Sequence, residues 1–235
     1  ESIMEIYNKN NFDINYKIDK SPVTNADLTA NKIIIDGLKK ISNYPIITEE
    51  NPIKFEFRKN WKKFWLIDPL DGTKDFISQT GEFTVNIALI SNNQPTLGVV
   101  GIPKTGDIYF AIKNSGAFKN GAKIFNNSNR GDIIGADSKQ HSSKLTSAFF
   151  KKNNITKVKK YGSSIKFCKL AEGLIDVYPR FNGTKEWDTA AGQIIIKESG
   201  CKIIDLKSKT ELSYNKENFK NNFFIAYRND LSFEL

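Results

Sequence analysis

The chain has 235 residues, 39% of them hydrophobic and 26% charged, which is ordinary for a soluble globular protein with a sizeable core. No apolar run approaches the roughly 20 residues of a membrane span, and two cysteines, Cys168 and Cys201, are too few for a disulfide framework. The net charge of +9 raises the question of nucleic-acid binding. Because the lysines are scattered among Asn and Ile, we expect a solvated surface that steers a small polyanion instead. The two cysteines indicate a reducing compartment, which we expect to be the cytoplasm.

The first half of the chain is predicted to contain helices followed by a meander of strands. One helix reaches about Asn10, and a second covers about residues 26–41, where Thr24 or Asn25 can cap its start. Alternating and continuous apolar runs predict strands over residues 46–48, 64–67, 83–90, 95–102, 107–112 and 116–118, with a turn at 92–93.

The second half alternates strands with helices. Strands are predicted over residues 132–136, 157–161, 175–180, 203–205 and 223–226, and helices over 142–152, 164–173 and 188–199. This pattern favours layers of sheet and helix over a parallel barrel. We expect an N-terminal α+β region over residues 1–125 and a C-terminal α/β region over 126–235.

The most informative motif is Asp-Pro-Leu-Asp-Gly-Thr at residues 68–73, which follows a buried strand. Two carboxylates so close together repel unless protons or a cation neutralise them. Hard oxygen ligands suit Mg²⁺, and the Leu70 carbonyl lies between Asp68 and Asp71. Gly72 and Thr73 offer backbone N–H groups to an anion where the next helix begins.

Two further acidic motifs gain weight from their positions. Glu49 and Glu50 end the strand that precedes the first motif. Trp-Asp-Thr-Ala-Ala-Gly at residues 187–192 opens a helix, and Asp188 is expected at its N-cap. Taken alone, Glu49 and Glu50 could be an ordinary pair of surface acids. Taken alone, Asp188 could be an aspartate that only caps the helix.

Together these motifs resemble the inositol monophosphatase superfamily of Mg²⁺-dependent, lithium-sensitive phosphatases. Within it, the chain is most similar to the branch that acts on bisphosphorylated nucleotides. The resemblance covers most of the chain, in segments 21–27, 48–50, 65–76, 81–90, 162–168, 171–173, 178–181 and 187–192. It implies a five-layer αβαβα sandwich of the α/β (α+β) class.

The resemblance also implies a ligand set. Glu49, Asp68 and the Leu70 carbonyl would hold one Mg²⁺, and Asp68, Asp71 and Asp188 a second. Asp27 and Thr73 would lie beside the attacking water, with Glu49 as a further catalytic residue. No cysteine or histidine is placed as a nucleophile, so direct attack by a metal-activated water is expected. Glu50 is expected to support the site, as is Asp75.

The resemblance to the family also implies which residues bind substrate. The resemblance assigns the scissile phosphate to Gly72 and Thr73, with Lys74 and Asp188 nearby. It assigns Ser163, Lys166 and Arg180 to the second half of the substrate, where Arg180 would hold the second phosphate. An arginine suits this role because it binds phosphate bidentately and stays charged. His141 matches a position near the nucleoside, although its neighbours depart from the family pattern.

The implied reaction is hydrolysis of adenosine 3′,5′-bisphosphate to AMP and phosphate, with Mg²⁺ as cofactor. Inositol monophosphatase or fructose-1,6-bisphosphatase activity is the alternative within the enzymes. A non-catalytic, basic nucleic-acid-binding module is a remote alternative, because such a module gains nothing from clustered acids. The sequence leaves open the oligomeric state, the number of ions bound at once and the choice between the bisphosphate and its sulfated analogue.

Overall fold

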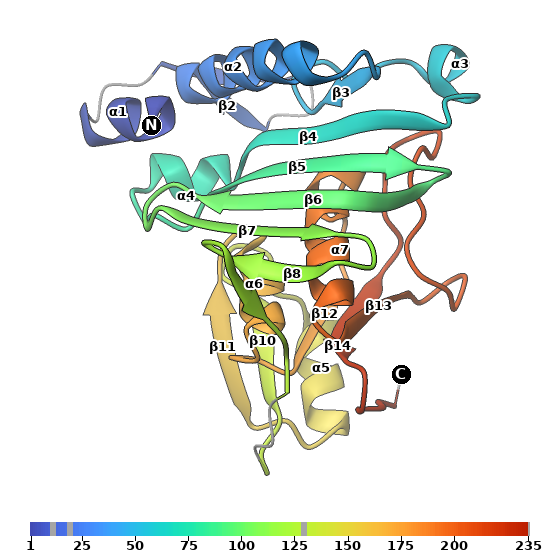
Figure 1. Ribbon diagram of the computed structural model, residues 1–235. Coiled ribbons are helices and arrows are strands. Elements are labelled where there is room, and N and C mark those ends of the chain that lie inside the picture. Colours follow the sequence, from blue (N-terminus) through green and yellow to red (C-terminus); the bar gives the residue numbers. More distant parts are fainter. Residues whose placement is uncertain (10–12, 18–20, 128–130, 235) are drawn as a thin grey trace.

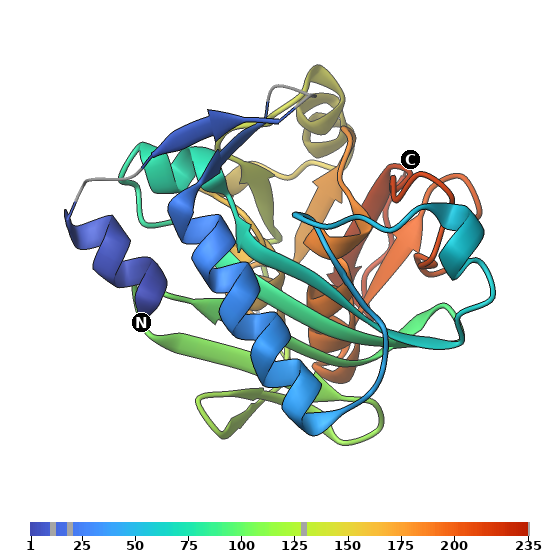
Figure 2. The same cartoon turned by 90° about the horizontal axis from the view of Figure 1, so that it is seen from above.

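The computed structural model describes residues 1–9, 13–17, 21–127 and 131–234, so the expected helix end at Asn10 lies outside the described residues. The elements stack in five layers (Figure 1). Helices α1 (Ser2–Lys9) and α2 (Asn25–Ile41) form the outer layer, and α2 lies across one face of a seven-stranded sheet with α1 beside it (Figure 2). Helices α6 (Ile165–Ala171) and α7 (Ala190–Glu198) follow, then a five-stranded sheet, then α5 (Lys144–Lys152). The predicted α/β sandwich is confirmed.

The seven-stranded sheet follows chain order from β3 to β9, as expected for a meander. All its neighbouring strands are antiparallel except β3 and β4, which are parallel. Its strands are β3 (Ile46–Thr48), β4 (Lys63–Asp71), β5 (Thr84–Ser91), β6 (Gln94–Ile102), β7 (Asp107–Ile112), β8 (Gly116–Lys119) and β9 (Ala122–Ile124). The predicted turn after β5 is present, with positive φ at Asn92 and Asn93, as hairpin turns require.

Strand β4 is apolar on both faces because helices cover both. Trp65 and Ile67 pack with Leu38 of α2, whereas Phe64 and Leu66 belong to the cluster that includes Ile194 of α7. This alternation follows from the two-residue period of a strand. The buried run therefore fixes the position of the acidic motif at its C-terminal end.

The five-stranded sheet has the order β11-β10-β12-β14-β13 and mixes parallel and antiparallel pairs. Its strands are β10 (Ile134–Ser138), β11 (Lys157–Tyr161), β12 (Val177–Arg180), β13 (Cys201–Asp205) and β14 (Phe224–Arg228). In β12, Val177 packs with Phe150 of α5, and Tyr178 packs with Phe167 of α6. The division of the chain near residue 125 stays a prediction.

Shorter elements were not predicted. They are the paired strands β1 (Ile14–Tyr16) and β2 (Pro22–Thr24), and helix α3 (Phe55–Arg58). Thr24, rather than Asn25, caps α2, because its hydroxyl accepts the N–H of Ala26. Within the described residues, no helix has the length and apolar character needed to cross a membrane.

One expectation about β4 was wrong. The sequence placed the strand end at Asp68, but β4 continues to Asp71. Asp68 pairs with Asn86 of β5 and Asp71 pairs with Thr84, with an irregular register between them. Pro69 lies in this interval, where its missing N–H leaves no ladder bond unpaired. The continued pairing fixes both aspartates to the edge of a rigid sheet.

We predict that Gly98→Ala destabilises the protein by about 1–3 kcal/mol, the usual cost of overpacking a core. A Cβ at Gly98 in β6 would lie 2.4 Å from Cγ2 of Ile194 and 2.7 Å from the Ala191 carbonyl oxygen, both in α7. The control is Gly101→Ala in the same strand, where an added Cβ meets nothing within 4 Å. Urea unfolding of both variants measures the difference, and equal losses would contradict this close packing of α7 on β6.

Candidate functional site

One pocket of about 390 Å³ collects nearly all the predicted site residues. It lies where β4 and α4 (Thr73–Ile77) of the N-terminal half meet α6, β12 and the short 3₁₀ helix η1 (Glu186–Asp188) of the second half. The predicted residues in its lining are Glu49, Asp68, Leu70, Asp71, Gly72, Thr73, Lys74, His141, Ser163, Lys166, Arg180 and Asp188. Asp27 is outside this lining but contacts it through Thr73.

The two aspartates of the central motif are held differently. Asp68 is buried, and its Oδ1 accepts the N–H of Leu70 at 3.1 Å. Asp71 is partly buried, and its Oδ2 lies 2.9 Å from the hydroxyl of Ser164. The same hydroxyl lies 3.0 Å from the backbone carbonyl oxygen of Asp188. Ser164 therefore joins the acidic motifs of the two halves, a role that sequence reasoning missed because nothing local distinguishes it from Ser163.

Asp188 does not cap α7, contrary to expectation. It ends η1, and helix α7 begins at Ala190 with Thr189 at its N-cap position, where no side-chain cap bond forms. The Asp188 carboxylate instead turns back, and its Oδ2 accepts the N–H of Lys185 at 2.8 Å. This bond directs the carboxylate towards the other acids rather than along α7.

The acids perturb one another. Burial raises the pKa of Asp68 well above its ordinary value, and the negative charges of Glu49, Asp71 and Asp188 raise it further. Burial raises the pKa of Asp188 in the same way, with Asp71 and Glu49 as the next causes. Four carboxylates from distant parts of the chain thus repel across one pocket.

This donor set fits a hard divalent cation. The carboxylates and the Leu70 carbonyl offer only oxygen, which Mg²⁺ prefers, and a cation would relieve their repulsion. In the part of the chain that the structure describes, no three acidic, histidine or cysteine side chains lie in an arrangement that could hold a metal ion as it stands.

A lysine that the sequence did not single out neutralises part of this charge. The ammonium of Lys17 lies 2.9 Å from Oε1 of Glu49 and 2.7 Å from Oε1 of Glu50. These two carboxylates raise the pKa of Lys17 against the effect of burial, so it stays charged. Lys17 thus joins Glu50 to Glu49 of the pocket lining, and the supporting role of Glu50 stays a prediction.

Asp27 and Thr73 form a pair beside the acidic motif. The Thr73 hydroxyl lies 3.1 Å from Oδ1 of Asp27 and 3.3 Å from the Leu70 carbonyl oxygen. The other oxygen of Asp27 accepts the N–H and the hydroxyl of Thr24 at 2.8 and 2.6 Å. Burial raises the pKa of Asp27, whereas these hydrogen bonds lower it. The start of α2 thereby holds a carboxylate at the edge of the pocket.

Gly72 is required by its surroundings. Its φ of +91° lies in the left-handed region that favours glycine. An added Cβ would lie 3.2 Å from the Cβ of Ser163, a contact tight enough to disturb the pocket floor. Ser163 itself has a φ of +40°, which is uncommon for a residue with a side chain.

One part of the pocket lining, which we call the basic wall, contains Lys166 and Arg180. Lys166 is buried, and its ammonium donates to the carbonyls of Tyr161 and Ser163. Burial lowers the pKa of Lys166 to about 8, and the charge of Arg180 adds to this. Burial and the charges of Arg180 and Lys74 also lower the pKa of His141. Lys166 and Arg180 thus bring positive charge to the pocket that the carboxylates line, whereas the lowered pKa keeps His141 neutral at pH 7.

Two polar atoms of this wall are buried without a partner among the described residues. They are the Ser163 hydroxyl and Nε of Arg180. A buried donor left unpaired costs roughly 1–3 kcal/mol, so such atoms mark places where a ligand can bind. Both were predicted to contact substrate.

The comparisons with known proteins find relatives along most of the chain. Residues 1–226 match the model of the inositol monophosphatase family. The 3′(2′),5′-bisphosphate nucleotidase CysQ of Buchnera aphidicola is 42% identical over 209 residues, which are 86% of this chain and 78% of that protein. CysQ of Escherichia coli K12 is 38% identical over 227 residues, covering 94% of this chain and 92% of its own length.

A solved structure is similar along nearly the whole chain. CysQ from Bacteroides thetaiotaomicron, described as a bacterial member of the inositol monophosphatase family, superimposes with a TM-score of 0.86. It is 34% identical, and the match covers 98% of this chain and 93% of that one.

We predict that Asp68→Asn raises the thermal stability in chelator by a few degrees and removes any stabilisation by added Mg²⁺. A raised pKa means that the folded state binds the proton more tightly, so the wild type loses stability as the pH rises from about 3.8 towards neutrality. Asparagine carries no charge and can still accept the Leu70 N–H. About 1 kcal/mol shifts the Tm of a domain of about 150–250 residues by about 2–4 °C.

The measurement is Tm at pH 7 and at pH 5, with chelator and with Mg²⁺. The advantage of Asp68→Asn in chelator should shrink at the lower pH, where the wild-type carboxyl gains its proton. The proposed repulsion would be refuted if the Tm difference between Asp68→Asn and the wild type in chelator were the same at both pH values and the variant still responded to Mg²⁺.

Proposed function

The chain belongs to the inositol monophosphatase family, and from this premise we propose that it is a Mg²⁺-dependent 3′(2′),5′-bisphosphate nucleotidase. Its substrate would be adenosine 3′,5′-bisphosphate, and its products AMP and phosphate. The relatives named above support the substrate class, since each is at least 34% identical over most of this chain.

One observation carries the proposal, namely that acidic and basic side chains line a single pocket. A phosphatase for one phosphate needs the acidic side chains and the cations that they would bind. A substrate with a second phosphate also needs buried positive groups in the same pocket, which Lys166 and Arg180 provide. The pocket of about 390 Å³ suits a nucleotide-sized ligand.

The acidic side would bind Mg²⁺ through Glu49, Asp68, the Leu70 carbonyl, Asp71 and Asp188. Bound Mg²⁺ would polarise the phosphoryl group, lower the pKa of water and stabilise the leaving oxygen. Asp27 and Thr73 would orient the attacking water, because the Thr73 hydroxyl already lies between Asp27 and the Leu70 carbonyl. The backbone N–H groups at Gly72 and Thr73 would bind the scissile phosphate, with Lys74 nearby.

The basic side would bind the rest of the substrate. Nε of Arg180 and the Ser163 hydroxyl lack partners among the described residues and would bond the second phosphate. Lys166 would add charge below pH of about 8. We place the nucleoside near His141, which is exposed at the pocket rim.

The alternatives are less well supported. Inositol phosphate or fructose bisphosphate hydrolysis is not favoured, because the curated relatives described above are nucleotidases. A nucleic-acid-binding module is opposed by the acidic half of the pocket, which would repel a polyanion. The two buried free thiols, Cys168 and Cys201, support a reducing, cytoplasmic compartment as the proposed location.

We predict that the purified protein releases phosphate from adenosine 3′,5′-bisphosphate in Mg²⁺ and that a chelator or Li⁺ suppresses this release. Asp188→Asn should reduce kcat roughly 100-fold or more, because loss of a cation removes several kcal/mol of transition-state stabilisation. The assay compares kcat/KM for adenosine 3′,5′-bisphosphate, inositol 1-phosphate and fructose 1,6-bisphosphate.

Circular dichroism of Asp188→Asn serves as the control for folding. Faster turnover of inositol phosphate than of the nucleotide would contradict the proposed substrate. Full activity after complete removal of divalent ions would contradict the proposed chemistry.

We predict that Arg180→Met lowers kcat/KM for adenosine 3′,5′-bisphosphate about 10- to 100-fold, since a hydrogen bond to a charged group contributes about 1.5–3 kcal/mol. Adenosine 3′-monophosphate is the matched substrate, because it lacks only the second phosphate. Its kcat/KM should change little in the variant. An equal loss on both substrates would remove Arg180 from the second-phosphate site.

A further inference from the structure

The turn that carries Asp188 is short, and its own backbone bonds are those from the N–H groups of Asp188 and Thr189 to the carbonyls of Lys185 and Glu186. It is a single 3₁₀ turn, Glu186–Asp188, and the Asp188 carboxylate is directed by one backbone group, the N–H of Lys185. If Lys185 rotated, that N–H would leave the carboxylate. Something outside the turn must therefore fix Lys185 and its neighbours.

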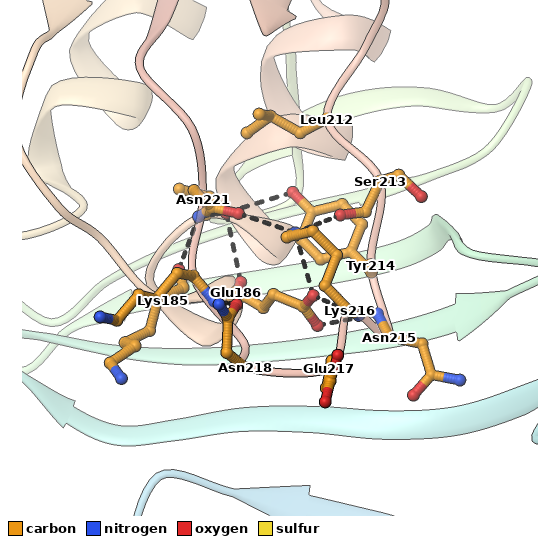
Figure 3. A network of polar contacts seen from close by, with 12 residues as sticks. Lys185, Glu186, Leu212, Ser213, Tyr214, Asn215, Lys216, Glu217, Asn218 and Asn221 are labelled. Atoms are coloured by element: carbon orange, nitrogen blue, oxygen red, sulfur yellow. Dashed lines mark hydrogen bonds and ion pairs between the residues drawn. The ribbon is translucent and has the colours of Figure 1, made fainter. Parts of the chain in front are cut away.

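The loop of residues 213–219 holds the turn through Glu186 (Figure 3). The Glu186 side chain is 0% exposed, and its two oxygens accept the backbone N–H groups of Asn215 and Lys216 at 2.8 and 2.7 Å. The ammonium of Lys216 lies 2.9 Å from the same carboxylate. The backbone of Glu186 adds a bond to the carbonyl oxygen of Phe219 at 2.8 Å.

The loop is fixed from its other side by a second buried charge. The Arg58 side chain is also 0% exposed, and it donates to Oδ1 of Asn215 and to the carbonyls of Lys216 and Glu217. Its guanidinium also stacks 3.7 Å from the centre of the Phe219 ring. Arg58 thus donates hydrogen bonds to the acceptors of the loop, and Glu186 accepts hydrogen bonds from its backbone N–H groups. Because both kinds of group are satisfied, the loop is a rigid support.

The same support reaches Lys185 directly. Nδ2 of Asn221 donates to the Lys185 carbonyl oxygen at 2.8 Å (Figure 3). The same nitrogen lies 3.0 Å from the Thr189 hydroxyl. Both residues flank the turn. Trp187, between Glu186 and Asp188, packs on the Phe219 ring with 5.1 Å between ring centres. Every residue from 185 to 187 is therefore held by the 213–221 segment.

We propose that Glu186 is a positioning residue, which holds the 185–188 turn so that the Asp188 carboxylate faces the other acids of the pocket. This inference rests on the proposed function, because Asp188 must be a metal ligand for its orientation to matter. Removing the Glu186 carboxylate frees the turn from the loop and weakens cation binding without any contact between Glu186 and the ion. Groups that orient metal ligands commonly change metal affinity 10- to 100-fold.

The test is Glu186→Gln, in which one amide oxygen still accepts an N–H while the NH₂ group faces the other donor. Binding of Mn²⁺ to the full-length protein, followed by electron paramagnetic resonance, is the readout that does not depend on turnover. We expect Mn²⁺ binding to be about 10- to 100-fold weaker. High Mg²⁺ should restore most of kcat, and KM for substrate at saturating Mg²⁺ should stay close to that of the wild type.

The matched control is Glu198→Gln, since the Glu198 carboxylate also accepts two backbone N–H groups, those of Asn114 and Gly116 at 2.9 and 3.0 Å. It lies at the opposite end of α7 from Asp188 and outside the pocket lining. It should lower Tm but leave Mn²⁺ affinity unchanged. Glu186→Asp keeps the charge and shortens the side chain, so it should weaken Mn²⁺ binding less than Glu186→Gln and provides the test if that variant does not fold.

The outcomes separate the two proposals. Wild-type Mn²⁺ affinity in Glu186→Gln, with only a lower Tm, would overturn the positioning role while leaving the nucleotidase proposal intact. A wild-type protein that binds no Mn²⁺, or binds it equally after Asp188→Asn, would refute the proposed metal site itself and this inference with it.

Discussion

The repulsion among four buried or partly buried carboxylates is the interaction on which the rest of this structure depends. Asp68 and Asp71 lie in β4, whereas Glu49 and Asp188 come from two other segments. Burial and then the charges of their neighbours raise the pKa values of Asp68 and Asp188. Such an arrangement is unfavourable in an empty, deprotonated pocket, and divalent cations stabilise it. The protein must therefore hold these groups together by other means.

Rigid elements around the pocket hold these carboxylates together. Strand β4 is apolar on both faces and continues through the acidic motif, so Asp68 and Asp71 are fixed to the seven-stranded sheet. Ser164 lies within 3.0 Å of both Asp71 and Asp188, which links α6 to the two acidic motifs. The buried pair of Glu186 and Arg58 fixes the loop behind Asp188, so strain at the pocket is offset by satisfied groups outside it.

The basic wall completes the electrostatic design. Lys166 and Arg180 are buried in the lining of the same pocket as the acids, and the burial that lowers the pKa of Lys166 to about 8 also strengthens its attraction to an anion. One pocket thus offers groups suited to cations and groups suited to a phosphate.

The sequence by itself determined the order of the main elements, the layered fold and a set of candidate site residues, nearly all of which line the pocket. Buried runs such as residues 64–67 and the spacing of the acidic motifs are local properties, which the chain carries before it folds. The prediction from sequence was wrong at Asp68, because β4 continues to Asp71, which pairs with Thr84. It was also wrong at Asp188, whose carboxylate accepts the N–H of Lys185 instead of capping α7. Only the tertiary structure decided the roles of Lys17, Ser164, Arg58 and Glu186, because the partners described above lie 24 to 159 residues away and no local pattern records such contacts.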